Sequence, residues 1–461
     1  MSSLATSHVV PESVSAPLAS TGRLSTAFGR RAFLLFGLGL VLIGPAFLNR
    51  HFLWAMVAWD GLVLLAWLVD LRLLPKPRDI LATREWSGAL QLGGETQMRL
   101  TFEGKTRTRL QMAIIVDLPE ALAQEPAEDS LVFRPANENC LTISVIPLQR
   151  GDAEIGPVFV RFQSPLGIAE RWARVDLPQT VRVYPGTGNR EEQSLNLLRT
   201  RRIEIIKRLS RHKGLGREFE SLREYRQGDA LRDICWPATA RRARLIVKEY
   251  QVERGQPIWI MLDCGRLMRA RVGNRTKLDS AVAAALNLAE VAMFGGDRVG
   301  LFAYGHHASR MVGLGRGDNH LRLIMDQLSL VQGESGEADH FGAAAKLLAK
   351  QSRRSLIVWI TDLPDSVMTP EVYEGATVLL GRHLVIFAVI ADPELKAEAE
   401  KRLRNPDGIF ETAAAMDVLH RRERLIASLR ARGAHTLEVE SGKLANAVVQ
   451  EYLSIKERDL L

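Results

Sequence analysis

The most extended feature of the hydrophobic pattern is an apolar stretch over residues 32–69, in which only two residues carry a formal charge. It divides into residues 32–48 and residues 52–69, joined by a polar turn. The halves contain 17 and 18 residues, close to the minimum for a helix that crosses about 30 Å of hydrocarbon. The pattern therefore predicts a transmembrane helical hairpin over residues 31–74. A buried hairpin in a soluble core and a cleaved signal peptide are the alternatives.

Basic residues flank this stretch on both sides and predict its orientation. They are Arg23, Arg30 and Arg31 before the first half, and Arg72, Lys76 and Arg78 after the second. Because positive residues are retained on the cytoplasmic side, both termini and the folded domains are expected in the cytoplasm, with residues 1–30 as a disordered tail. Asp60 lies in mid-span and is expected to be protonated or to face a partner helix. Helix association and proton transport both stay open as its role.

Residues 78–186 alternate short β-type runs with turn residues. The runs are 96–102, 110–116, 140–147, 156–162 and 181–184, and glycines and prolines separate them. Strands at this spacing predict a small antiparallel β-sandwich. Since the segment has no recognisable catalytic grouping, we expect a spacer or a binding module.

From residue 256 to residue 461 the pattern changes to apolar runs alternating with amphipathic helices. The runs are 258–262, 299–303, 356–360 and 384–390, and the helical patterns cover 276–294, 318–330, 340–351, 370–381, 409–432 and 443–457. Continuous apolar runs are typical of strands that helices cover on both faces. This order predicts an α/β domain with an open, mostly parallel, doubly wound sheet. Ligands of such sheets bind beyond the carboxyl ends of the strands, where Asp263 and Asp362 are expected.

Residues 187–255 connect these two domains and begin with a basic stretch. Residues 199–217 contain eight Lys or Arg residues and one acidic residue. A solvated helix face, attraction to anionic lipid and nucleic-acid binding are the three interpretations. Because the stretch lacks aromatic residues on which bases could stack, no nucleic acid is expected as a partner.

The segment from Gly216 to Arg241, which we name the strap, combines opposite charges with large apolar side chains. Its candidate site residues are Glu218, Phe219, Arg223, Tyr225, Gly228, Asp229, Arg232, Trp236 and Arg241. We expect the aromatic side chains to be buried against a neighbouring domain and Arg–carboxylate pairs to fix the register. Partner binding is the other role considered, and no Ser/His/Asp or Cys/His grouping favours catalysis.

The amino-acid composition excludes only a few classes of protein. The 461 residues include 61 Lys or Arg and 53 Asp or Glu, for a formal net charge of +8. Hydrophobic residues make up 46% and charged residues 25%, which excludes a mainly disordered chain. Cys140, Cys235 and Cys264 lie far apart in the sequence, so neither a disulfide framework nor a structural zinc site is expected.

The strap closely resembles the signature of the domain of unknown function 58 family, G-x-E-F-x-x-x-R-x-Y-x-x-G-D-x-x-R-x-I-x-W-x-x-x-A-R. One position differs, because Cys235 stands where the family often has an Asp before the Trp. The resemblance also covers the hairpin, the Val183-Tyr184-Pro185 end of the β-rich segment and the strand before Asp362. It implies a protein of the bacterial inner (plasma) membrane with a von Willebrand A-like domain, often associated with a MoxR-type AAA+ ATPase.

The α/β pattern also resembles the von Willebrand factor A domain, whose metal-ion-dependent adhesion site combines an Asp-x-Ser-x-Ser loop with a later Thr and a later Asp. Asp263 and Asp362 match the two Asp positions. Gly265 and Leu267 replace the hydroxyl residues, and Asp339 stands near the Thr position. The resemblance thus implies a degenerate Mg²⁺ site at the three carboxylates. The alternative is no cofactor, with Asp263 and Asp362 capping the following helices or pairing with Arg266 or Arg298, and with Arg266 or Arg269 supplying positive charge.

Two functions follow as hypotheses. The first is a membrane-anchored, non-enzymatic adaptor whose α/β domain binds a protein client or a MoxR-type ATPase in a chaperone-like role. The second is an enzyme: a metal-assisted hydrolase at Asp263, Asp339 and Asp362, or thiol chemistry at Cys264.

Overall fold

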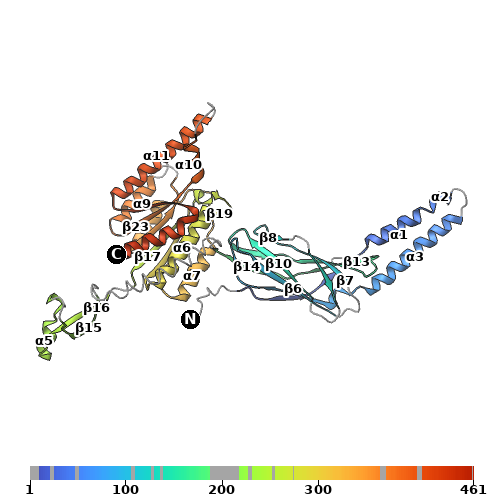
Figure 1. Ribbon diagram of the computed structural model, residues 1–461, viewed down its shortest axis with the longest axis horizontal. Coiled ribbons are helices and arrows are strands. Elements are labelled where there is room, and N and C mark those ends of the chain that lie inside the picture. Colours follow the sequence, from blue (N-terminus) through green and yellow to red (C-terminus); the bar gives the residue numbers. More distant parts are fainter. Residues whose placement is uncertain are drawn as a thin grey trace. The chain divides into compact units, whose positions relative to one another are not determined.

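The computed structural model describes residues 10–20, 25–46, 51–104, 110–125, 129–134, 139–186, 218–226, 231–251, 255–273, 275–363, 370–401, 408–458 and 460 (Figure 1). The chain divides into two compact units, residues 1–186 and residues 187–461. The basic stretch 199–217 and the strap residues Gly228 and Asp229 lie outside the described residues.

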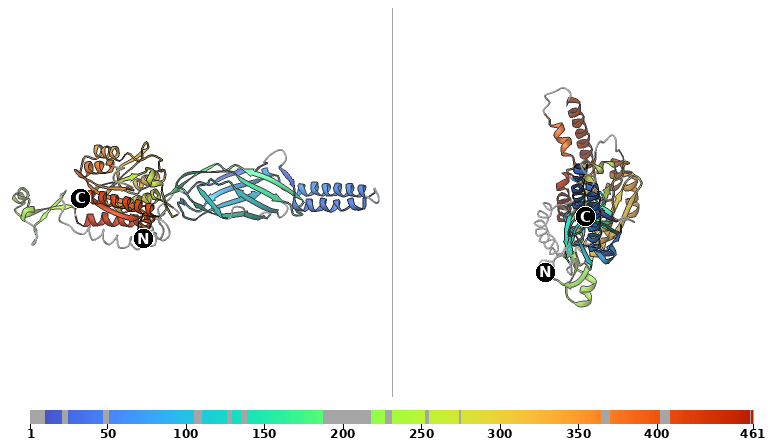
Figure 2. Two further views of the ribbon diagram at one scale, coloured as in Figure 1. Left: turned by 90° about the horizontal axis from the view of Figure 1, so that it is seen from above. Right: turned by 90° about the vertical axis from the view of Figure 1, so that its right-hand side faces the viewer.

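The predicted hairpin region of the first unit consists of α1 (Arg30–Leu40), α2 (Ile43–Ala46) and α3 (His51–Leu73). Helices α1 and α3 lie side by side (Figure 2), and Trp59 donates its indole N–H to the carbonyl of Leu35 at 2.9 Å. A Cβ added to Gly39 would lie 2.9 Å from the Asp60 carboxylate, so the missing side chain permits this close approach. Asp60 therefore faces its partner helix, as predicted.

Among the described residues, only α3, the second half of the predicted hairpin, is as long as a membrane-spanning helix. The helical segment His51–Asp79 is the one candidate there that is long and apolar enough to cross a membrane. Helix α1 has 11 residues and α2 has four, shorter than the continuous span of 17 residues predicted for the first arm. Two membrane crossings thus stay a prediction.

The rest of the first unit is β-rich, as predicted, and most of its strands pair antiparallel. One sheet has the order β1 (Val14–Pro17), β4 (Ile80–Trp86), β6 (Thr96–Gly104), β10 (Asn139–Pro147) and β8 (Leu122–Glu125). A second has β2 (Ala19–Ser20), β13 (Ala169–Val175), β12 (Val158–Gln163), β7 (Leu110–Val116) and β9 (Asp129–Phe133), with β3 (Thr26–Phe28) also paired to β13. A third contains β11 (Gly151–Ile155), β14 (Gln179–Tyr184) and β5 (Leu90–Gln91). Alternate side chains of these strands point inward into one hydrophobic core.

The expectation of a disordered tail over residues 1–30 is wrong for the segments that form β1, β2 and β3. Strand β1 pairs with β4, from Val14 opposite Arg84 to Pro17 opposite Leu81, and Leu18 is 1% exposed in the core. These strands are short and rich in Ser, Ala and Pro, a composition that is typical of linkers. They form because the edges of the two larger sheets offer unpaired backbone groups.

The second unit contains the predicted doubly wound domain. Its sheet has the order β21 (Ser309–Gly315), β20 (Arg298–Tyr304), β17 (Pro257–Asp263), β22 (Leu356–Thr361), β23 (Leu384–Ala391) and β24 (His435–Glu440), and only β21 is antiparallel to its neighbour. Numbered along the chain, this is the order 3-2-1-4-5-6. The helices are α6 (Lys277–Phe294), α7 (Asp318–Ser329), α8 (His340–Lys350), α9 (Pro370–Leu380), α10 (Pro393–Ala399), α11 (Ile409–Ala431) and α12 (Leu444–Glu457).

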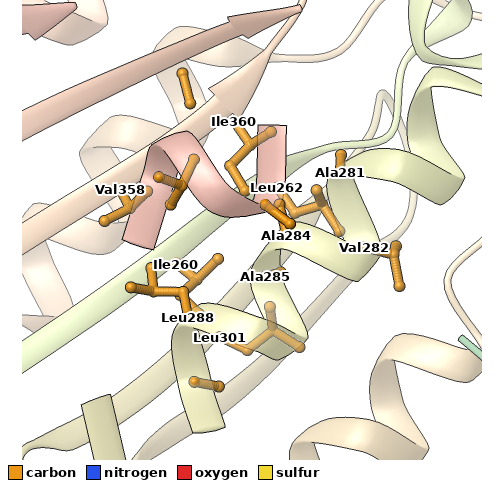
Figure 3. Packing of buried hydrophobic residues seen from close by; sticks show 14 of the residues in the cluster. Ile260, Leu262, Ala281, Val282, Ala284, Ala285, Leu288, Leu301, Val358 and Ile360 are labelled. Atoms are coloured by element: carbon orange, nitrogen blue, oxygen red, sulfur yellow. The ribbon is translucent and has the colours of Figure 1, made fainter. Parts of the chain in front are cut away.

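Each face of this sheet packs its own hydrophobic core. Ile260 and Leu262 of β17 point to one face, where they meet α6 and α12 (Figure 3). Trp259 and Met261 point to the other, where they meet α8, α9 and α11. This alternation explains why the sequence of β17 is apolar throughout, and it places the end of that strand at Asp263.

The strap forms the first strand of a small hairpin whose second strand lies just beyond it in the sequence. Strand β15 (Glu218–Glu224) pairs antiparallel with β16 (Ile246–Gln251). Between them lie the 3₁₀ turn η2 (Leu231–Asp233) and helix α5 (Trp236–Arg242).

Candidate functional site

The carboxyl edge of the sheet carries the two carboxylates that the sequence placed there. Asp263 is the last residue of β17, and Asp362 directly follows the neighbouring strand β22. The Asp263 carboxylate accepts hydrogen bonds from the backbone N–H of Gly265 and the hydroxyl of Thr361, each at 2.7 Å. Both Asp side chains are buried, so each requires a compensating partner.

Burial dominates the electrostatics of Asp263 and raises the pKa of its carboxyl. His340 and the hydrogen bonds from Gly265 and Thr361 act in the opposite direction but do not reverse the shift of this pKa. The proton of Asp263 is therefore held more tightly in the folded protein than in the unfolded one.

Asp362 instead forms an ion pair with Lys277, which the sequence analysis missed. Lys277 is the first residue of α6, whose start is fixed by a capping box between Thr276 and Asp279. Its ammonium nitrogen lies 2.8 Å from Asp362 Oδ2 and 3.0 Å from Asp392 Oδ2, and the residue is only 4% exposed. Burial lowers the pKa of Lys277, but the two carboxylates outweigh it, so this pKa is raised overall.

Arg422 of α11 supplies a second buried cation. Its Nη2 lies 3.5 Å from Asp362 Oδ1, and its Nε lies 3.1 Å from a carboxylate oxygen of Glu438 on β24. It also donates a hydrogen bond to the carbonyl of Ile390 at the end of β23. The expectation that Arg266 supplies the positive charge is wrong, because Arg266 pairs with Glu337 at 3.1 Å.

Asp339, the third predicted metal ligand, caps helix α8. Its carboxylate accepts the backbone N–H of Gly342 at 2.7 Å. Across the described residues, no group of three or more His, Cys, Asp or Glu side chains has an arrangement that could hold a metal ion. The structure therefore does not bring Asp263, Asp339 and Asp362 together as a metal site.

A buried aromatic network lies next to this edge and was also missed. The Tyr304 hydroxyl lies 2.9 Å from His340 Nδ1 and accepts the indole N–H of Trp359 at 2.6 Å. Burial raises the pKa of Tyr304 well above its ordinary value. Cys264 is buried too, and its thiol lies 3.6 Å from the carbonyl of Leu262.

The strap differs from its predicted form at Trp236, which is 65% exposed rather than buried. Arg241 is exposed as well, and Arg223 donates a hydrogen bond to the carbonyl of Glu224 at 3.1 Å. An exposed ion pair joins Glu224 of the strap to Arg244, which lies three residues beyond it, at 2.9 Å. Tyr225 donates its backbone N–H to Leu245. For Glu218, Phe219 and Arg232 only the backbone is described.

In the first unit, polar contacts fasten the base of α3 to the β-rich part. Asp70 is fully buried and accepts hydrogen bonds from the Ser164 hydroxyl and from the backbone N–H groups of Ile168 and Ala169, the latter two at 3.2 and 3.0 Å. Arg171 of β13 donates to the carbonyls of Leu74 and Pro75 at 3.2 and 2.7 Å. The hairpin region and the β-rich part are thus firmly joined.

Comparison with known proteins finds a family match over part of the chain. Residues 221–407 match the model of the family described as "Protein of unknown function DUF58". The family predicted from the sequence is confirmed for this segment. "Uncharacterized protein YeaD" from Bacillus subtilis (strain 168) is 24% identical over 313 residues, which cover 66% of this chain and 75% of that protein.

Two solved structures resemble parts of the chain. BatB from Bacteroides thetaiotaomicron, a conserved hypothetical protein, has a TM-score of 0.30 at 15% identity and covers 44% of this chain and 100% of its own. The VWA domain of SpRpn10 has a TM-score of 0.26 at 14% identity and covers 42% and 94%. Both TM-scores are below 0.5, so the strand order given above, and not these neighbours, defines the fold.

Proposed function

We propose that this DUF58-containing protein is a non-enzymatic adaptor anchored in the bacterial inner (plasma) membrane, with its folded domains in the cytoplasm. Its α/β domain and strap bind protein partners, among them a MoxR-type AAA+ ATPase and a client protein. The observation that carries the proposal is the way the hairpin region is joined to the β-rich part.

Strands on both sides of the hairpin region belong to the same sheets. Strand β1 precedes α1 and pairs with β4, which follows α3, while β2 and β3 pair with β13. Both ends of the segment 30–73 must therefore lie on one side of a membrane, so this segment crosses it an even number of times. Together with the apolar helix α3, this supports a two-crossing anchor.

The side chains at the outside of α1 and α3 also support membrane anchoring. Large apolar residues there are exposed, among them Phe33, Leu34, Leu38, Trp54, Leu62, Leu65 and Val69. Such an apolar surface is stable in lipid and costly in water.

The chemistry at the sheet edge supports binding rather than catalysis. Asp362 is neutralised by Lys277, and Asp263 is buried and hydrogen-bonded to Thr361. Carboxylates held in this way are poorly suited to activate water with a metal, which the hydrolase alternative requires. In contrast, Trp236 and Leu231 of the strap are 65% and 72% exposed, as in surfaces that recognise a partner.

The test is the affinity of the full chain in lipid nanodiscs for a purified MoxR-type ATPase from the same organism. Trp236→Ala should weaken binding by about tenfold or more, the loss typical of an aromatic anchor. Trp172→Ala is the matched control, because Trp172 is a partly exposed (42%) Trp in the β-rich unit, and it should bind like wild type. Equal loss in both variants, or no binding by wild type at tens of micromolar, would reject the proposed partner.

A further inference from the structure

The charged cluster at the end of β22 lies at the sheet edge where the resemblance to the von Willebrand A domain implies a metal ion, but the cations found there belong to side chains. In the von Willebrand A fold a divalent metal is held near the two Asp positions occupied here by Asp263 and Asp362. The residues present do not fit such a metal. Gly265 and Leu267 offer no side-chain oxygen, and Asp339 is engaged as a helix cap.

We propose that the Lys277 ammonium takes the place of the divalent cation at this sheet edge, so that the domain is metal-independent. Its nitrogen contacts carboxylates of two different strand ends, Asp362 after β22 and Asp392 after β23, at 2.8 and 3.0 Å. Helix α6 delivers this nitrogen from its first residue, and the Thr276–Asp279 capping box fixes where that residue lies.

The charge balance supports this substitution. Around Asp362, the carboxylates of Asp362, Asp392 and Glu438 face Lys277 and Arg422. Two monovalent side-chain cations thus supply the same positive charge as one divalent ion. Both cations lie within ion-pair distance of Asp362, and a bound Mg²⁺ would have to displace a buried ammonium from its carboxylates.

The packing around Gly265 also supports a site without a metal ion. A Cβ at this residue would come within 2.8 Å of the backbone nitrogen of Ala338. A serine in place of Gly265 therefore could not be accommodated without movement of the segment before Asp339. The local packing has adapted to a site without the hydroxyl ligand.

The experiment follows the unfolding of the α/β domain by hydrogen exchange of peptides from β17 and β22, in the full chain in detergent. The unfolding temperature of wild type should be the same in EDTA and in millimolar Mg²⁺ or Mn²⁺. Lys277→Ala should unfold at least about 5 °C lower in EDTA, because the buried carboxylate of Asp362 and the partly exposed carboxylate of Asp392 lose this counter-ion. Millimolar Mn²⁺ should then raise its unfolding temperature by about 3 °C or more, since the truncated side chain leaves room for an ion between Asp362 and Asp392.

Two further variants control the interpretation. Lys277→Met removes the charge but fills the space, so it should be destabilised and gain nothing from Mn²⁺. Lys456→Ala breaks another ion pair with a buried carboxylate, 2.5 Å from Asp297, and should be destabilised without rescue by Mn²⁺. Rescue of Lys456→Ala equal to that of Lys277→Ala would overturn the proposal.

A metal effect on wild type would overturn it directly, even if the Lys277 variants did not fold. The decisive outcome is an unfolding temperature of wild type that rises with Mg²⁺ or Mn²⁺ and loses this rise in Asp362→Asn. No partner protein enters these measurements, so their result is independent of whether the proposed adaptor function holds.

Discussion

At the end of β17, burial and hydrogen bonding have opposite effects on the pKa of the Asp263 carboxyl. Thr361 and Gly265 donate hydrogen bonds to it, but its removal from water is the larger effect and raises its pKa. The neighbouring Asp392 shows the opposite balance. Burial raises its pKa, but the hydrogen bond and charge of Lys277 and the backbone N–H groups of Leu395 and Glu394 together outweigh burial, so this pKa is lowered overall. Two carboxyl groups near the same edge thus respond to pH in opposite directions.

This difference predicts opposite pH dependence for two variants. A carboxyl whose pKa is raised on folding loses its contribution to stability as pH rises from 3.8 through the folded value, so Asp263→Asn should gain stability relative to wild type over that range. A carboxyl whose pKa is lowered contributes stability above 3.8 and loses it as pH falls through the folded value, so Asp392→Asn should lose relative stability as pH rises. Urea unfolding at about pH 2.5, pH 4 and pH 7 measures both, the lower interval for Asp392→Asn and the upper interval for Asp263→Asn. The same direction in the two variants would contradict this assignment.

The exposed Trp236 provides a second prediction at the residue scale. Because its indole is 65% exposed, Trp236→Ala should change the free energy of unfolding by less than about 0.5 kcal/mol. Trp359 is fully buried, and Trp359→Ala should cost about 3–5 kcal/mol. Denaturant unfolding of the full chain in detergent distinguishes them, and a loss of several kcal/mol for Trp236→Ala would show that the strap is packed.

At the scale of elements, the sequence predicted the α/β domain well because its strands are covered on both faces. The apolar run 356–360 corresponds to β22 at Leu356–Thr361, and the helical pattern 276–294 corresponds to α6 at Lys277–Phe294. The local hydrophobic pattern is enough to identify strands and helices of this kind.

Other features required knowledge of the three-dimensional arrangement. Lys277, Asp392 and Arg422 are far apart in the sequence, and only the strand order brings them to Asp362. The strands β1 to β3 are too short and polar for their own pattern to identify them. Trp236 was misassigned because an aromatic residue among charges is typical both of a docked segment and of an exposed recognition surface.

The junction between α3 and the β-rich part gives a prediction about an element as a whole. Asp70→Ala removes the acceptor of three hydrogen bonds and leaves the buried Ser164 hydroxyl and backbone N–H groups without it. We expect a loss of about 2–4 kcal/mol in the free energy of unfolding of the first unit. Asp79→Ala, at an exposed position six residues beyond the end of α3, is the control and should change stability little. Equal effects in both variants would mean that Asp70 does not fasten the helix.

At the scale of the whole molecule, the pairing of the strands that surround the hairpin region joins the proposed anchor to the β-rich part. Because β1 and β4 are neighbours in one sheet, the N-terminal segment and the β-rich part must share a compartment. The turn before α3 must lie in the other compartment if the hairpin crosses the membrane. The topology of the proposed anchor can therefore be tested at three positions: before the hairpin, in the turn before α3, and in the β-rich part.

The most direct test labels single cysteines with an impermeant maleimide in intact cells and in inverted membrane vesicles. The reporters are Val10→Cys, His51→Cys and the native Cys140, which is exposed on β10, each in a background in which the other reactive cysteines are replaced by Ser. The account predicts that His51→Cys reacts in intact cells, whereas Val10→Cys and Cys140 react only in inverted vesicles. Labelling of all three from the same side, or of Val10→Cys and Cys140 from opposite sides, would contradict the two-crossing anchor and the function built on it.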